Sequence, residues 1–147
     1  MATDIDVLTV ARFSLSVDGR ELASFGELGG ISSSIEVAEV VEAAGDQTVL
    51  KKLPGKRTPP TITLKRGKNS SLDLWDWHEA VWTGEATARK NCSLVMYATD
   101  GTPVARYHLE LAWPAKLEIG ALKSGPNEVL METVTIVCEH IQRLAPV

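Results

Sequence analysis

The side chains best suited to chemistry in this sequence are three histidines and two cysteines, and their spacing supports no reaction centre. His78, His108 and His140 lie far apart in the chain. None belongs to an H-E-x-x-H pattern, and the cysteines lack metal-ligand spacing. The sequence also contains no G-x-S-x-G elbow and no phosphate-binding glycine loop. We therefore predict a protein that is not an enzyme and that needs no metal or cofactor.

The two cysteines, Cys92 and Cys138, lie in apolar, strand-like runs, "NCSLVMY" and "TVTIVCEH". Two cysteines can pair, but in a reducing compartment such residues serve as small buried hydrophobic side chains, which we favour. The N-terminal residues carry Asp4 and Asp6, no basic segment and no long apolar run. They do not resemble a signal peptide, so we expect the protein to be made and assembled in the cytoplasm.

Length and composition predict one globular domain spanning residues 1–147. Hydrophobic residues make up 44% and charged residues 23% of the chain, unlike a disordered sequence. No apolar run is long enough to cross a membrane. The net charge of −4 argues against a dedicated nucleic-acid-binding protein, which usually carries a basic patch.

Two basic clusters are candidates for an interaction site. Their members are Lys51, Lys52, Lys56 and Arg57 in the first cluster and Lys65, Arg66 and Lys68 in the second. Such residues either pair with an acidic surface of another subunit or lie in ordinary solvated turns. Charge alone favours the solvated turn, because exposed ion pairs contribute little stability.

Alternation of apolar and polar residues predicts a protein built mainly of β-strands. Phe13, Leu15 and Val17 alternate with serines, as on a half-buried strand. An Asp-Gly pair between two such runs is a strong hairpin signal, and it occurs at Asp18-Gly19 and again at Asp100-Gly101. We expect a β-hairpin at each position.

Further strands are predicted at residues 31–37 and 105–113, and Pro114 is expected to interrupt the second of them. After a Gly-Pro turn at 125–126, a long final strand is predicted over about 128–140. We count roughly seven strands, mostly joined by hairpins. The fold class is therefore mainly β, an antiparallel sandwich or barrel of two packed sheets with one α-helix.

The segment 45–60, "GDQTVLKKLPGKRTPP", interrupts this alternation. It contains two glycines, three prolines and four basic residues and shows little periodicity. Since proline cannot donate to a central ladder, the segment is predicted to be a long loop or an extended arm. Ordering so long a loop costs conformational entropy, so we expect contacts outside the subunit's own core to order it.

One short helix is predicted in "SSLDLWDWHEAVWTG". Ser70 or Ser71 is placed to cap its N-terminus, Asp73 lies in the first turn, and Gly84 ends it. The apolar side chains assigned to packing are Leu74, Trp75, Trp77, Val81 and Trp82. Because the rest of the chain is poor in aromatic residues, we expect these side chains to supply much of the core.

The order of these motifs resembles that of the phage tail tube protein family, and more closely the inner tube proteins of contractile injection systems of the antifeeding-prophage type. The resemblance covers nearly the whole chain. It rests on "FSLSVDGRELASFGELGGI", "KLPGKRTPPTITLKRG", "LWDWHEAV", "RKNCSLVMYATDG" and "NEVLMETVTIVCEHIQRL".

The resemblance implies a structural subunit that forms hexameric rings and stacks them into a tube inside a contractile sheath. It also implies partners at the baseplate and tube terminator, cargo in the lumen, and a particle that is released from the cell. Interface residues are then expected at Lys51, Lys52, Leu53, Lys56, Arg57, Lys65 and Arg66. A baseplate or tube-initiator protein of the same particle and a monomeric ligand-binding β-sandwich are the alternatives.

Overall fold

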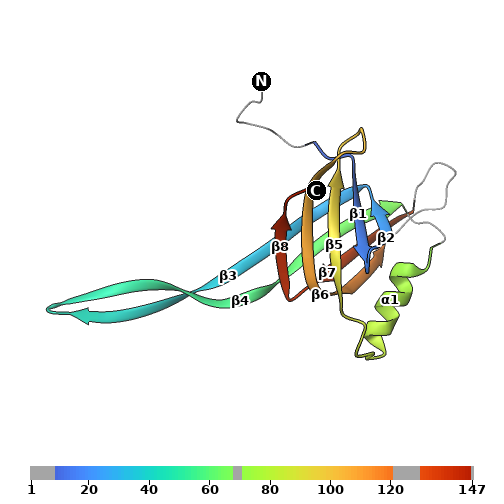
Figure 1. The fold of residues 1–147 in the computed structure, drawn as a ribbon. Coiled ribbons are helices and arrows are strands. Elements are labelled where there is room, and N and C mark those ends of the chain that lie inside the picture. Colours follow the sequence, from blue (N-terminus) through green and yellow to red (C-terminus); the bar gives the residue numbers. More distant parts are fainter. Residues whose placement is uncertain (1–8, 68–70, 121–129, 147) are drawn as a thin grey trace, which may run out of the picture.

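The computed structural model describes residues 9–67, 71–120 and 130–146. Lys68, Ser70, the turn at 125–126 and Glu128 therefore lie outside the described residues. The described part of the chain forms eight strands and one helix, which are arranged as in Figure 1. Their bounds are β1 Arg12–Val17, β2 Arg20–Phe25, β3 Glu27–Ala44, β4 Gln47–Gly67, α1 Asp73–Trp82, β5 Lys90–Tyr97, β6 Pro103–Ile119, β7 Met131–Val137 and β8 His140–Leu144.

The strands form one antiparallel sheet that folds over into two packed layers. The first layer contains β2, β1, β5, β8 and the N-terminal half of β6. The second layer contains the C-terminal half of β6, followed by β7, β4 and β3. β6 passes between the layers near Leu111, which has φ 49° and whose backbone N–H donates to Asn91 Oδ1 at 3.0 Å. The predicted sandwich of antiparallel strands is confirmed.

Both predicted Asp-Gly hairpins are present. At the β1–β2 turn, Asp18 and Gly19 have φ 52° and 78°, the left-handed conformation that a tight two-residue hairpin requires. At the β5–β6 turn, the Asp100 carboxylate accepts a hydrogen bond from the Thr102 backbone N–H at 2.9 Å. This bond lowers the pKa of Asp100.

Two predicted strand ends are wrong. Pro114 does not end its strand, because β6 continues through it and absorbs the irregularity as a register shift between Pro114 and Lys116. The predicted strand over 128–140 is broken at Cys138 and Glu139 into β7 and β8. At this break the chain leaves the second layer for the first: the Cys138 N–H bonds to Pro60 O, and the Glu139 N–H bonds to Glu110 O.

The core lies between the two layers and is closed on one side by α1. Leu15 and Leu94 of the first layer and Leu64 and Val134 of the second are fully buried, as is Leu74 of the helix. Seventeen buried apolar residues from both layers and the helix form this single cluster. Sheet faces and helix therefore share one core. We call the two layers and the helix around this core the body of the protein.

β3 and β4 extend far beyond the body as a two-stranded arm, residues 35–57, that projects to one side (Figure 1). The interpretation of 45–60 as an extended arm is confirmed, and the interpretation as a loop is wrong, because residues 47–60 belong to β4. The prolines are tolerated because β4 pairs within the arm only with β3, at registers that shift nearby. Gly45, with φ 64°, forms the tip.

Candidate assembly surfaces

The arm exposes apolar side chains that no other described residue covers. Every residue of the arm is exposed. Val37 and Val41 on β3 are each 65% exposed, and Leu50 and Leu53 on β4 are 56% and 48% exposed. A two-stranded ribbon without a core is marginally stable in water. Contiguous exposed apolar residues are typical of interaction surfaces.

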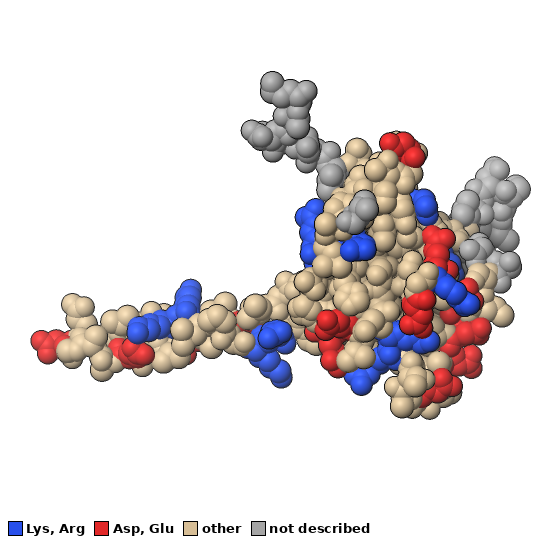
Figure 2. Space-filling model, viewed as in Figure 1, with Lys and Arg blue, Asp and Glu red and all other residues tan. Residues whose placement is uncertain are grey.

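The arm also carries the first basic cluster. Lys51, Lys52, Lys56 and Arg57, together with Leu53, lie on β4 within the arm, and all are exposed. Basic groups are seen in blue along the projecting arm in Figure 2. The Lys51 ammonium lies 2.8 Å from the carboxylate of Glu42 on β3. Both side chains are half exposed, so the pair contributes little to stability.

The second basic cluster divides between surface and core. Lys65 is partly exposed and lies opposite Glu27 of β3. Arg66, by contrast, is only 6% exposed and lies 3.6 Å from Glu132 of β7, with its guanidinium 5.7 Å from the centre of the Phe25 ring. Arg66 is therefore paired inside its own subunit, and its burial argues against the predicted contact with another subunit.

The sequence could not reveal this pair, because Arg66 and Glu132 are 66 positions apart and become neighbours only through the β4–β7 register. A buried ion pair gains little net stability, but removing one partner leaves an uncompensated buried charge. Arg66 Nε has no hydrogen-bond partner among the described residues. The pair therefore makes the β4–β7 register costly to change.

Helix α1 has one buried and one exposed side. Leu74 and Trp77 are buried, Val81 is partly buried, and the Trp77 indole N–H donates to Ala88 O at 2.6 Å. Trp75 and Trp82 are 53% and 83% exposed. The expectation that these two tryptophans belong to the core of the subunit is wrong, because they lie on the side of the helix turned away from both sheets.

The ends of α1 follow the sequence in part. The residue assigned before its first turn is Leu72, which has no side-chain cap. The Ser71 hydroxyl accepts a long hydrogen bond, 3.4 Å, from the Asp73 N–H, which is the bond expected of a serine that caps the helix N-terminus. The helix ends after Trp82, and Gly84 follows with φ 82°, as predicted.

The second layer has an unpaired edge at each end. Its strand order is β6-β7-β4-β3, and among the described residues β3 pairs only with β4. At the other end, residues 113–119 of β6 pair only with β7 in the described part of the chain. Unpaired edges present backbone N–H and C=O groups to another strand.

The outward face of this layer is rich in hydroxyl groups and balanced in charge. Thr63 of β4 lies opposite Thr135 of β7, while the alternating residues of both strands point into the core. Lys116 and Glu118 of β6 pair with each other at 2.8 Å on the same face. The face therefore offers neither a large apolar patch nor a charge of one sign.

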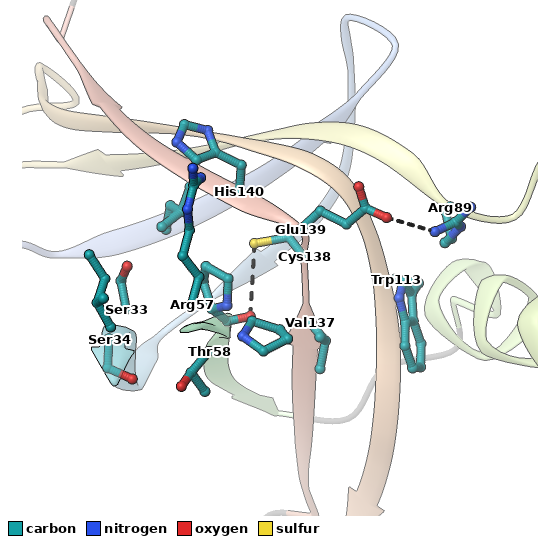
Figure 3. A pocket seen from close by; sticks show the side chains of 14 residues that line it. Ser33, Ser34, Arg57, Thr58, Arg89, Trp113, Val137, Cys138, Glu139 and His140 are labelled. Carbon is teal, nitrogen blue, oxygen red and sulfur yellow. Dashed lines mark hydrogen bonds and ion pairs between the residues drawn. The ribbon is translucent and has the colours of Figure 1, made fainter. Parts of the chain in front are cut away.

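A hollow of about 600 Å³ lies where the arm leaves the body. Figure 3 shows Ser33, Ser34 and Arg57 on one side of it and Trp113 and Arg89 on the other. Its floor is the break between β7 and β8, and there Glu139 pairs with Arg89 at 2.9 Å. Among the described residues, Arg57 has no ion pair, so its charge is available to a molecule in the hollow.

The histidines and cysteines do not come together into a reaction centre. His78 Nδ1 lies 2.7 Å from Pro114 O, which ties α1 to β6, and His140 lies 4.0 Å from Glu110 in the first layer. No group of three or more potential metal ligands occurs within the described ranges. Cys92 and Cys138 are buried free thiols, and burial raises their pKa values to about 12 and about 11.

Comparison with known proteins identifies the family. Residues 9–142 match the family model described as T4-like virus tail tube protein gp19, and the chain belongs to this family. It is a family of structural tube subunits and not of enzymes. No curated protein sequence matches the chain. Within residues 9–67, 71–120 and 130–146, no helix has the length and apolar character of a membrane span.

Solved structures share the fold over nearly the whole chain. A chain of the anti-feeding prophage baseplate, 6-fold symmetrised, is 20% identical with a TM-score of 0.76, covering 97% of this chain and 98% of that one. A chain of the PVC sheath-tube complex of an extracellular contractile injection system is also 20% identical, with a TM-score of 0.76 and coverages of 95% and 92%. Hcp1 from Flavobacterium johnsoniae is 20% identical with a TM-score of 0.50, over 90% and 94%.

Proposed function

We propose that this structural subunit forms hexameric rings that stack into the inner tube of a contractile injection system. The observation that carries the proposal is the pair of unpaired edges at opposite ends of the second layer. β3 of one copy can add to the outer half of β6 of the next copy in the antiparallel sense. A head-to-tail contact of this kind closes into a ring when the rotation from one copy to the next divides a full turn by a whole number.

In such a ring the second layers of six copies join into one continuous barrel. Their hydroxyl-rich, charge-balanced outer faces line the channel, and cargo passes along a wall without a large apolar patch or one dominant charge. The number six is supported by the fold shared with a chain from a 6-fold symmetrised particle. The exposed arm then reaches subunits of the neighbouring ring and so links successive rings.

The similar chains also support the proposed partners. Their particles are described as a sheath-tube complex, a baseplate, and a sheath and tube terminator. By this likeness the tube grows from a baseplate, lies within a contractile sheath and ends at a terminator. It is assembled in the bacterial cytoplasm and leaves the cell as part of the particle.

Hydrogen exchange combined with electron microscopy tests the proposal. Purified protein should form rings or tubes about as wide as six such bodies. Backbone amides of β3 at residues 29–34 should exchange faster in dissociated subunits than in rings, whereas those of β1, which is paired on both sides, should not change. A chain that stays monomeric at high concentration in every salt condition would falsify the proposal.

A tube initiator at the baseplate is the second candidate, because the chain covers a chain of a baseplate structure almost completely. Imaging separates the two. An initiator forms single rings and adds no further copies of itself, whereas a tube subunit forms stacks of variable length.

A further inference from the structure

The exposed side of α1 forms a second apolar stripe, opposite to the one that packs in the core. Leu72, Trp75, Glu79 and Trp82 follow one another at spacings of three and four residues, so they lie along one side of the helix. Leu72 is 64% exposed and Trp82 is 83% exposed. Tryptophan is the residue most enriched at the energetic centres of protein interfaces. Two exposed tryptophans on one short helix therefore indicate a binding surface.

This surface is also grooved, and it carries one acidic side chain. Glu79 lies on it, whereas Asp73 and Asp76 line a different hollow beside Trp77 and Ala80, and the helix has no lysine or arginine. Trp75, His78, Glu79 and Trp82 surround a shallow groove of about 310 Å³, and the Trp75 and His78 rings lie 6.2 Å apart. The matching surface must therefore offer apolar groups that fill the groove and a positive charge for Glu79.

The hollow at the root of the arm has both properties. Ile35, 57% exposed, stands on its β3 wall, and Trp113 and Pro59 add further apolar surface. Arg57 supplies a positive charge that no acidic side chain neutralises among the described residues. At about 600 Å³ the hollow is large enough to receive aromatic side chains.

The sheet places α1 and the β3 wall of the hollow at opposite ends of the second layer. The His78–Pro114 contact fixes α1 beside the unpaired edge of β6, and residues 33–35 of β3 form the far wall of the hollow, which reaches across the layer to Trp113 of β6. Figure 1 shows α1 on the side of the body opposite to the arm. When β3 of one copy adds to β6 of the next, the helix of the second copy is carried toward the hollow of the first.

We propose that the Trp75–Trp82 side of α1 binds in the arm-root hollow of the adjacent copy of this chain in the ring. The inference rests on the proposed ring and adds to it a specific side-chain lock. The edge joint is made by backbone atoms and tolerates slippage by two residues. The tryptophans in the hollow would fix the register, because a slipped joint leaves them in water.

Cross-linking tests this contact directly. Two exposed residues are replaced by cysteine in the same chain. They are Thr83, next to Trp82, and Ser34, in the wall of the hollow. The native cysteines are 1% exposed, so we expect them not to react. A short bis-maleimide should link Thr83→Cys/Ser34→Cys rings into a ladder of up to six copies on a denaturing gel. Each single variant, and Thr83→Cys with Thr48→Cys at the arm tip, should give none.

The failure of this inference is distinguishable from the failure of the proposed function. If the double variant forms rings in the microscope but gives no ladder, or if the arm-tip pair is linked instead, the helix does not occupy the hollow and the ring proposal stands. If the parent chain forms no rings, both fall together.

Charge exchange provides the second measurement. Glu79→Arg and Arg57→Glu should each raise the concentration needed for half-maximal ring formation at least tenfold, and the double variant should recover most of the loss. Trp82→Ala should weaken ring formation similarly, whereas Trp82→Phe should retain most of it. Ring formation by Trp82→Ala at the parent's concentration would show that this helix face serves another protein, which overturns the inference.

Discussion

Two long strands, β3 and β4, run through both the body and the arm of this protein, yet the two regions obey different constraints. Within the body, Ile62 and Leu64 of β4 are at most 1% exposed, whereas in the arm Leu50 of the same strand is 56% exposed. The body is stabilised by its own core. Within the described part of the chain the arm has only its cross-strand pairs, so we expect its stability to depend on surfaces outside this part.

The largest difference is expected between equivalent truncations in the two regions. Leu64→Ala should lower the free energy of unfolding by about 4 kcal/mol, because it opens a cavity in a fully buried site. Leu50→Ala should change it by no more than about 0.5 kcal/mol. Urea denaturation of dissociated subunits measures both. Equal losses would show that the arm packs on the body in solution.

A loss nearly as large is expected when the buried ion pair is broken. Glu132→Gln leaves the Arg66 guanidinium buried without a counter-charge and should cost about 3 kcal/mol. Exposed Glu42→Gln, which breaks the ion pair with Lys51 in the arm, should cost less than about 0.5 kcal/mol. Urea denaturation of dissociated subunits measures the free energy of unfolding of both variants. A small effect at Glu132 would mean that water reaches Arg66.

The arm should show the reverse pattern, with a small effect on stability and a large effect on assembly. Replacing residues 40–51 by Asn-Gly keeps a hairpin but removes the tip, and reversing Lys51 and Lys52 to glutamate keeps its length. Both variants should retain the parent's circular dichroism and lose ring stacking, as seen by sedimentation and negative stain. The matched control replaces both lysines with arginine. Tubes of normal length from the shortened variant would show that stacking is carried elsewhere.

The smallest effect is expected at the cysteines. Replacing Cys92 and Cys138 with alanine should cost about 1 kcal/mol per site, the cost of a small cavity, and leave assembly unchanged. Denaturation and imaging of the double variant check this. A disulfide on non-reducing gels whose loss prevents folding would contradict the interpretation of both as reduced core residues.

Local sequence was enough to predict several elements and the family. The Asp-Gly pairs at 18–19 and 100–101 predicted both hairpins, since few residues adopt the positive φ angles that such turns need. Gly84 correctly marked the end of the helix. The ordered motifs correctly indicated the tail tube family. The interface roles assigned to the arm lysines and Leu53 stay predictions.

Other features depended on contacts between distant residues. Periodicity placed Trp75 and Trp82 on a helix but could not say which side of it the sheets cover, and the tertiary structure leaves both exposed. Proline content left two interpretations of segment 45–60 open, a long loop or an extended arm. β4 forms there, because β3 pairs with it along the length of the arm.

The sequence by itself determined the helix, the tight turns and most strands of the body, because these depend on neighbours within a few residues. Only the tertiary structure decided that Arg66 meets Glu132, that β6 serves both layers, and that the second layer ends in unpaired edges. The physical reason is sheet register. A strand pairs with partners far away in sequence, so burial of a charge or exposure of an edge is settled only when all the strands are in place.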